Sequence, residues 1–249
     1  MQRRPAARTI GGHGGRNVGA RENPALTASA GGRLSRRRNG ADLHGGNMFI
    51  QVIQGKVRDT DQLNRLMERW REELMPGATG YLGTTAGVSD DGTFVALARF
   101  ESPDAARANS ERPEQGSWWS EVEQCFDGPV TFLDCTEVQP WLSGGSDDAH
   151  FVQIMEGRSP DPKRMHELMT QHSDEIHQAR PEIIGGLMME AGDGRWVDAI
   201  YFTSEEEARN GERMEIPEDV HEHMEEGRRL MGEVAYFDLH EPMLVSARR

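Results

Sequence analysis

Two stretches of this sequence decide its fold, because the second repeats the first. Residues 48–74 read MFIQVIQGKVRDTDQLNRLMERWREEL, and residues 150–176 read HFVQIMEGRSPDPKRMHELMTQHSDEI. At an offset of 102, the identical pairs in these stretches are Phe49/Phe151, Gln51/Gln153, Gly55/Gly157, Asp59/Asp161, Leu66/Leu168, Met67/Met169 and Glu73/Glu175. The match continues through Asp91-Gly92/Asp193-Gly194 and, at an offset of 104, through Asp134/Asp238. A repeat of this extent indicates one structural module written twice.

Each copy predicts the same order of elements. Residues 49–54 alternate and are rich in Val, Ile and Phe, which is typical of a strand. Asp59 and Asp161 stand where a helix needs a capping residue. An apolar helical stripe follows in each copy, formed by Leu63, Leu66, Met67, Trp70 and Leu74, and by Met165, Leu168, Met169, His172 and Ile176. The two Asp-Gly steps then predict hairpins between paired strands.

The second half of each module completes the pattern. We expect a further helix over residues 117–126 and 218–231, and a final strand over 130–136 and 234–240. The resulting order, βαββαβ, is that of the ferredoxin-like module, an α+β fold. One such module leaves a bare sheet face, so we predict that the two copies cover each other as a pseudo-dimer within one chain.

The first 47 residues differ from the rest. They hold nine Arg, ten Gly and only two acids, for a net charge of about +7, and they have too few aliphatic residues to bury a core. We predict a disordered tail over 1–47, a first module over 48–142, a flexible linker over 143–149 and a second module over 150–249. One interpretation is that Met48 is the true start; the alternative is a basic arm that binds an anionic surface.

Composition excludes several classes of function. The chain has 249 residues and a net charge of −14, so residues 48–249 carry about −21, which argues against nucleic-acid binding. No apolar run reaches the roughly 18 residues that cross a membrane. Cys125 and Cys135 are too few for a disulfide scaffold. His221 and His223 are two residues apart and point to different helix faces, so we expect no metal site. We predict a cytoplasmic protein that is a monomer.

Three features resemble a known family. They are the strands FIQVIQG and FVQIMEG, the Leu-Met pair in the helix that follows, and the segment ARFESPDAARANSERPEQGSWWSEV over residues 98–122. Together they resemble the antibiotic biosynthesis monooxygenase branch of the dimeric α/β-barrel superfamily, over residues 48–249 and in two copies. The resemblance implies an intramolecular dimeric α/β barrel and, for activity, oxygenation without a cofactor or haem degradation.

The residues depart from the haem-degrading pattern. Members of that kind are similar in using an Asn on the first strand, a Trp at the start of the second helical region and a His on the next helix. Here Gln51 and Gln153 replace the Asn, Asn210 stands near the expected Trp of the second copy, and only His221 or His223 fits the His. We therefore expect no haem degradation and no cofactor, while haem binding stays open.

Several side chains are candidates for a site in such a pocket. Gln51 and Gln153 lie among apolar strand neighbours, where an amide either links strands or donates to a ligand. Arg99, whose counterpart is Tyr201, would hold an anionic or phenolate substrate, or else lie exposed at an edge.

Aromatic and basic residues on the helices add further candidates. Trp118 and Trp119 either pack in the core or stack on an aromatic substrate. His172 replaces Trp70 on the apolar stripe, so it is either a core residue or a general base.

We therefore expect a monooxygenase acting on a small hydrophobic or aromatic compound. In this hypothesis His172 and Arg99 are catalytic, while Gln51, Gln153, Trp118, Trp119 and Tyr201 bind substrate. The alternatives are a module that binds a small molecule or haem without turnover, and an acidic protein that recruits a basic partner.

Overall fold

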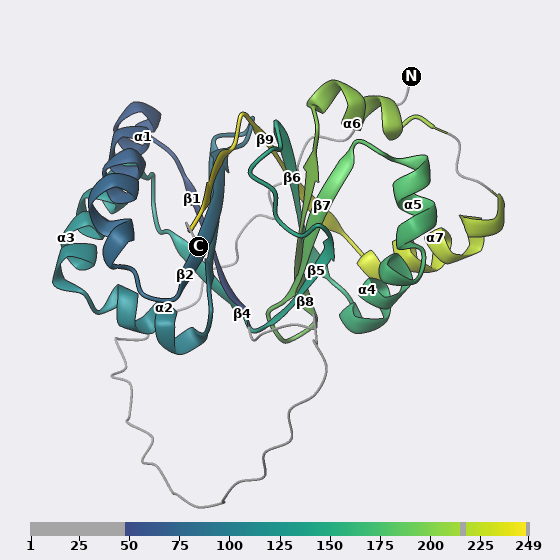
Figure 1. Ribbon diagram of the computed structural model, residues 1–249, viewed down its shortest axis with the longest axis horizontal. Coiled ribbons are helices and arrows are strands. Elements are labelled where there is room, and N and C mark those ends of the chain that lie inside the picture. Colours follow the sequence, from purple (N-terminus) through teal and green to yellow (C-terminus); the bar gives the residue numbers. More distant parts are fainter. Residues whose placement is uncertain (1–47, 215–217, 248–249) are drawn as a thin grey trace, which may run out of the picture. The chain divides into compact units, whose positions relative to one another are not determined.

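The structure, a computed structural model, describes residues 48–214 and 218–247. The expected disordered tail over 1–47 lies outside these residues. The described part contains two five-stranded antiparallel sheets with helices on their outer faces (Figure 1). The tandem α+β fold expected from the repeat is therefore confirmed.

The first module follows the predicted order. Its strands and helices are β1 (Phe49–Lys56), α1 (Thr60–Arg69), β2 (Tyr81–Val88), β3 (Thr93–Phe100), α2 (Pro103–Ser110), α3 (Pro113–Val122) and β4 (Thr131–Cys135). The helix α1 passes into a π-helical turn over Trp70–Leu74, so the apolar stripe continues beyond its end. Antiparallel pairing places Phe49 opposite Phe100 and Ile50 opposite Cys135.

The second module repeats this order with one break. It contains β6 (Phe151–Arg158), α4 (Pro162–Gln171), α5 (Ser173–Ala179), β7 (Ile183–Glu190), β8 (Arg195–Phe202), α6 (Glu205–Gly211), α7 (Glu218–Met231) and β9 (Val234–His240). The expected continuous helical stripe through His172 is wrong, because His172 lies between α4 and α5 with non-helical φ and ψ of −113° and 23°.

Two strands that the sequence pattern did not predict join the modules. They are β5 (Glu137–Leu142), which follows the first module, and β10 (Met243–Ser246), which follows the second. Each pairs with the sheet of the other half: β5 with β7, and β10 with β2. The sheet orders are therefore β10-β2-β3-β1-β4 and β5-β7-β8-β6-β9. Each sheet is completed by a strand from the other half of the chain.

The core has three layers because each sheet buries both faces. One cluster lies between the first sheet and its helices and another between the second sheet and its helices. The middle cluster draws on both sheets and includes Val52 and Leu97 from the first and Ile154 and Leu187 from the second. Each sheet thus covers the face that a lone module would leave bare.

Residues that correspond in the two modules meet in the middle layer. Gln54 donates from Nε2 to Glu156 Oε2 at 2.9 Å, and these two residues are 102 positions apart, which is the offset of the repeat. Arg99 and Tyr201, also 102 apart, lie 3.5 Å from each other between Nη1 and the phenol oxygen. A local two-fold relation between the modules therefore passes close to both pairs.

Candidate functional site

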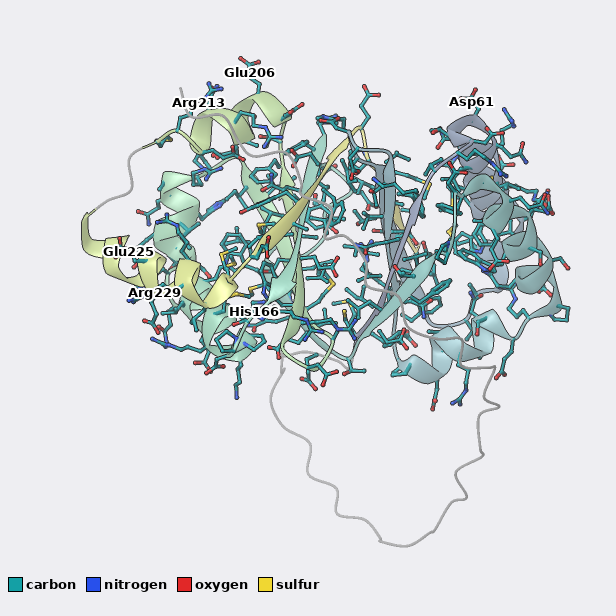
Figure 2. The ribbon with its side chains drawn as sticks, turned by 180° about the vertical axis from the view of Figure 1, so that it is seen from behind. Asp61, His166, Glu206, Arg213, Glu225 and Arg229 are labelled. Carbon is teal, nitrogen blue, oxygen red and sulfur yellow. The ribbon has the colours of Figure 1, made fainter. Side chains whose placement is uncertain are left out.

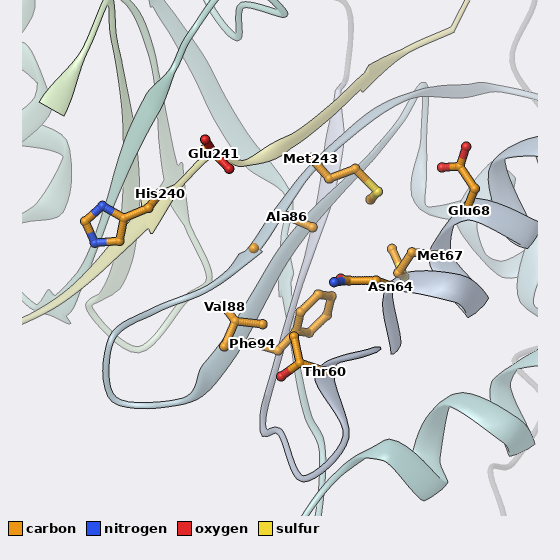
Figure 3. A pocket seen from close by; sticks show the side chains of 11 residues that line it. Thr60, Asn64, Met67, Glu68, Ala86, Val88, Phe94, His240, Glu241 and Met243 are labelled. Carbon is orange, nitrogen blue, oxygen red and sulfur yellow. The ribbon is translucent and has the colours of Figure 1, made fainter. Parts of the chain in front are cut away.

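A hollow with a volume of about 370 Å³ lies on the helix side of the first sheet, between α1 and the strands β2 and β3 (Figure 3). Its floor is apolar, with Ala86 and Phe94 buried. The segment that joins β9 to β10 closes one side, so the second half of the chain supplies part of the wall. The lining residues are Thr60, Asn64, Met67, Glu68, Ala86, Gly87, Val88, Phe94, His240, Glu241 and Met243.

One face of α1 forms the helical wall. Asp59 begins the helix by accepting a hydrogen bond from the backbone N–H of Gln62 at 2.9 Å. From this start, Thr60, Asn64 and Met67 follow at spacings of four and three residues, which places them on one side of the helix. The cap thus fixes where α1 begins, and the helical spacing places these three side chains on the side that faces the hollow.

The rim of the hollow is acidic. Glu68 comes from α1 and Glu241 from the segment after β9. His240 is held by two further acids, with Nδ1 2.9 Å from Glu205 and Nε2 3.1 Å from Asp90. Among the described residues that line the hollow there is no Lys or Arg. The hollow thus combines an apolar floor with a negative rim.

The second module fills the corresponding space with larger side chains. Counterparts at the repeat offset are Asn64/His166, Ala86/Met188, Val88/Glu190, Phe94/Trp196 and Ala96/Asp198. Met188 is 1% exposed and Trp196 is fully buried. The two copies have therefore diverged: the first keeps a hollow at the place where the second is packed.

A buried cluster of charged groups completes this packing. His166 on α4 lies on the helix side of the second sheet (Figure 2), with Nε2 3.0 Å from Asp198 Oδ1 and Nδ1 3.5 Å from Glu190 Oε1. Burial alone would lower the pKa of His166. The hydrogen bond and charge of Asp198, with the charge of Glu190, outweigh burial and raise that pKa above its ordinary value. The two carboxylates therefore favour the protonated form of the buried His166.

A second buried polar group lies between the sheets. Arg99 donates from Nη1 to Thr85 Oγ1 at 2.8 Å and from Nη2 to the Val245 carbonyl at 3.4 Å. Tyr201 is fully buried beside it and shares a 2.7 Å hydrogen bond with Thr85. Burial raises the pKa of Tyr201 although Arg99 and Thr85 oppose the shift. The phenol is thus held neutral.

The linker covers this polar group. A Cβ atom on Gly145 would lie 3.3 Å from the Tyr201 phenol oxygen and 3.4 Å from Arg99 Nη1. Asp147 accepts a hydrogen bond from Ser246 Oγ at 2.9 Å, which ties the linker to β10. The linker therefore lies against Arg99 and Tyr201, and its glycines allow that close approach.

Comparison with solved structures identifies proteins that have the same fold as this chain. No family model and no curated protein matches the sequence. A candidate monooxygenase from Lactobacillus acidophilus aligns with a TM-score of 0.64 and 12% identity, covering 80% of this chain and 96% of that one. A candidate monooxygenase from Fusobacterium nucleatum gives 0.63 and 10% identity, with coverages of 81% and 95%. This chain shares the fold of these two structures.

An anthrone oxidase-like protein has the same fold, with a TM-score of 0.59, 13% identity and coverages of 82% of this chain and 94% of that one. At these identities the likeness is one of fold, and a fold alone does not fix a reaction. No helix among the described residues is long and apolar enough to span a membrane.

The predicted glutamines link neighbouring strands within each sheet. Gln51 Nε2 donates to Asp134 Oδ1 on the neighbouring strand at 2.8 Å. Gln153 Nε2 donates to Asp238 Oδ1 in the same way, also at 2.8 Å. The repeat has therefore kept the same cross-strand pair in both modules.

The predicted helical residues lie apart from the hollow. Trp118 is buried and donates from Nε1 to the Leu66 carbonyl at 2.8 Å. Trp119 is half-buried, with its ring edge-on to Phe132 at a centroid distance of 5.2 Å. His172 is half-buried at the break between α4 and α5. None of the seven predicted site residues is among those that line the hollow.

Cysteines and histidines give no metal centre in the part of the chain that the structure describes. Cys125 and Cys135 are free and buried, and burial raises the pKa of Cys135 to about 12. No group of three potential ligands among His, Cys, Asp and Glu comes together in the described ranges. The side chains of His221 and His223 lie outside the described residues.

Sequence reasoning missed both the hollow and the His166 cluster. One signal was present: Asp198 stands in the otherwise apolar run Trp196-Val197-Asp198-Ala199-Ile200. A carboxylate in a strand buried on both faces needs a partner, and His166 provides it. The hollow had no such signal, because it depends on small side chains that meet only in the folded chain.

Proposed function

We propose that this chain is a cofactor-independent monooxygenase that binds one small hydrophobic or aromatic compound in the hollow of its first module. The proposal also holds that the chain works as a monomer in the cytoplasm. The observation that carries it is the contrast between the modules. In the first module the small side chain of Ala86 leaves the hollow open. In the second module the larger Met188 occupies the corresponding position and is buried. Candidate monooxygenases with the same fold support the reaction class.

The lining residues suit the binding of such a compound. Phe94, Met67 and Met243 offer an aromatic ring and two adaptable thioethers to an apolar body. Asn64 and Thr60 offer hydrogen bonds that would fix its orientation. The volume of about 370 Å³ is near the lower end of the range for small-ligand pockets, roughly 300–1,000 Å³.

Binding without turnover is a second candidate function. Among the described lining residues His240 is the one imidazole, and both of its ring nitrogens already face the acids Glu205 and Asp90. A general base for oxygenation is therefore less evident than a binding surface. Oxygen consumption with a bound compound, and a product one oxygen atom heavier, would separate turnover from binding.

Filling the hollow tests the proposal directly. The variant Ala86→Met introduces the residue that stands at the corresponding place in the second module, so the sheet is able to hold it. We expect 1-naphthol to bind the full chain at one site and the variant to bind it at least tenfold more weakly, measured by isothermal titration calorimetry.

The matched control adds bulk outside the hollow. Ala98→Ile introduces the residue at the corresponding position of the second module, Ile200. Like Ala86, Ala98 packs in the cluster between the first sheet and its helices, but it does not line the hollow. It should leave the affinity unchanged. Two sites per chain, or equal binding by Ala86→Met and the native chain, would show that the compound binds elsewhere.

A further inference from the structure

The charge of the rim selects among the compounds that would fit the hollow. Resting on the proposed function, we infer that the ligand of the first module is a cationic amine with an apolar body. The hollow places the carboxylates Glu68 and Glu241 at its rim above an apolar floor, and no Lys or Arg is among its described lining residues. An anionic ligand would therefore lose hydration without gaining a Lys or Arg partner, and it would face the rim carboxylates.

The two rim carboxylates belong to different parts of the chain. Figure 3 shows Glu68 on α1 and Glu241 on the segment after β9. Glu68 already pairs with Arg71 on the outer side of the helix, which partly neutralises it. Glu241 forms no ion pair with another described residue. It is therefore the carboxylate more available to a ligand cation.

The position of Glu241 is fixed by the strand exchange. It lies between β9, which pairs with β6 in the second sheet, and β10, which pairs with β2 in the first. Its φ of 49° is in the left-handed region, which is unusual for a residue with a side chain. The pairing of both flanking strands holds this turn in place beside the hollow.

The floor suits the uncharged part of such a ligand. Phe94 is 5% exposed and presents an aromatic ring, against which an apolar or aromatic body can pack. Met67 and Met243 flank the space with flexible, polarisable side chains. An aryl or alkyl body would lie on this floor, and its ammonium group would point to the rim.

The second module lacks this combination. The counterpart of Glu68 is Thr170, and the floor is packed by Met188 and Trp196. Glu137, the counterpart of Glu241, is exposed at the start of β5. It keeps the acid without the hollow, so it provides a matched control for the role of Glu241.

Three probes of nearly equal size separate charge from shape. They are 1-naphthylmethylamine, 1-naphthalenemethanol and 1-naphthoate, which are a cation, a neutral molecule and an anion near pH 7. In titration calorimetry of the full chain, we expect the amine to bind about tenfold tighter than the alcohol and the carboxylate about tenfold weaker. Added salt should weaken the amine most, because exposed charges are screened.

Variants of the rim assign the effect to the hollow. Glu241→Gln should weaken the amine about fivefold and leave the alcohol unchanged, whereas Glu137→Gln should change neither. Equal binding of amine and alcohol, or no effect of Glu241→Gln, would overturn the inference and leave the pocket itself standing. If Ala86→Met binds all three probes as the native chain does, or if none binds the native chain, both the inference and the proposed function fail.

Discussion

Replacing His166 with Asn is expected to lower the free energy of unfolding by about 3 kcal/mol near pH 6, because it leaves two carboxylates without their buried cation. Asn is the residue at the corresponding position of the first module, Asn64, so the helix itself tolerates it. The side chain of Asp198 is 1% exposed and cannot recover hydration, while that of Glu190 is 28% exposed and contributes less. Urea denaturation of the full chain measures the loss.

The same cluster predicts a pH dependence. The pKa of His166 is raised in the folded state above its ordinary value of about 6.5. Its stabilisation is therefore complete below about pH 6.5 and is lost as the pH rises through the folded-state pKa. The difference in stability between the native chain and His166→Asn should shrink over that rise.

Two controls define this result. Glu190→Gln removes the more exposed carboxylate and should cost about 1 kcal/mol. A variant carrying His166→Asn, Asp198→Ala and Glu190→Val introduces the residues of the first module at all three positions, and it should recover much of the loss. A change below about 0.5 kcal/mol for His166→Asn would mean that the cluster contributes little to stability.

Replacing Tyr201 with Arg is expected to destabilise the chain by about 4 kcal/mol, because a second guanidinium would be buried beside Arg99. Tyr201 has no accessible surface, and its hydroxyl contacts Thr85 and Arg99. Two like charges would then be buried side by side in this layer, away from water. The free energy of unfolding in urea is again the measurement.

The exchange of both residues provides the internal control. Arg99→Tyr with Tyr201→Arg restores a single cation, so about half of the loss should return. The remainder reflects Thr85, whose hydrogen bond to Arg99 has no equivalent in the second sheet, because its counterpart is Leu187. If the double variant were no more stable than Tyr201→Arg alone, the repulsion between like charges would not be the cause.

The fold was predictable from the sequence because it depends on repeated patterns. The strand residues over 49–54, the capping Asp59 and the Asp-Gly hairpin each indicate a local element, and their repetition fixes the order of both modules. The exchanged strands were not predictable in this way. β5 includes Pro140, which is unfavourable in a strand, and its pairing with β7 is decided by the packing of the two sheets.

The candidate site was less predictable, for a physical reason. The predicted residues were large or polar side chains, such as Arg99 and Trp118, and the structure places these in buried contacts. The hollow instead arises from small side chains, above all Ala86, and from a turn about 150 residues away along the chain. A small residue such as Ala86 does not by itself indicate a binding site. Its role becomes apparent when it is compared with Met188, its counterpart in the second module.

The exchanged strands set an order of events during synthesis. β5 is synthesised before β7, so the edge strand of the second sheet is already present when β7 is made. The first sheet must wait for β10, which begins 108 positions after the end of β4. At about 5–20 residues per second this delay is roughly 5–20 seconds, during which β2 is an unpaired edge open to other chains. The half of the chain that holds the hollow is thus expected to be translated first and finished last.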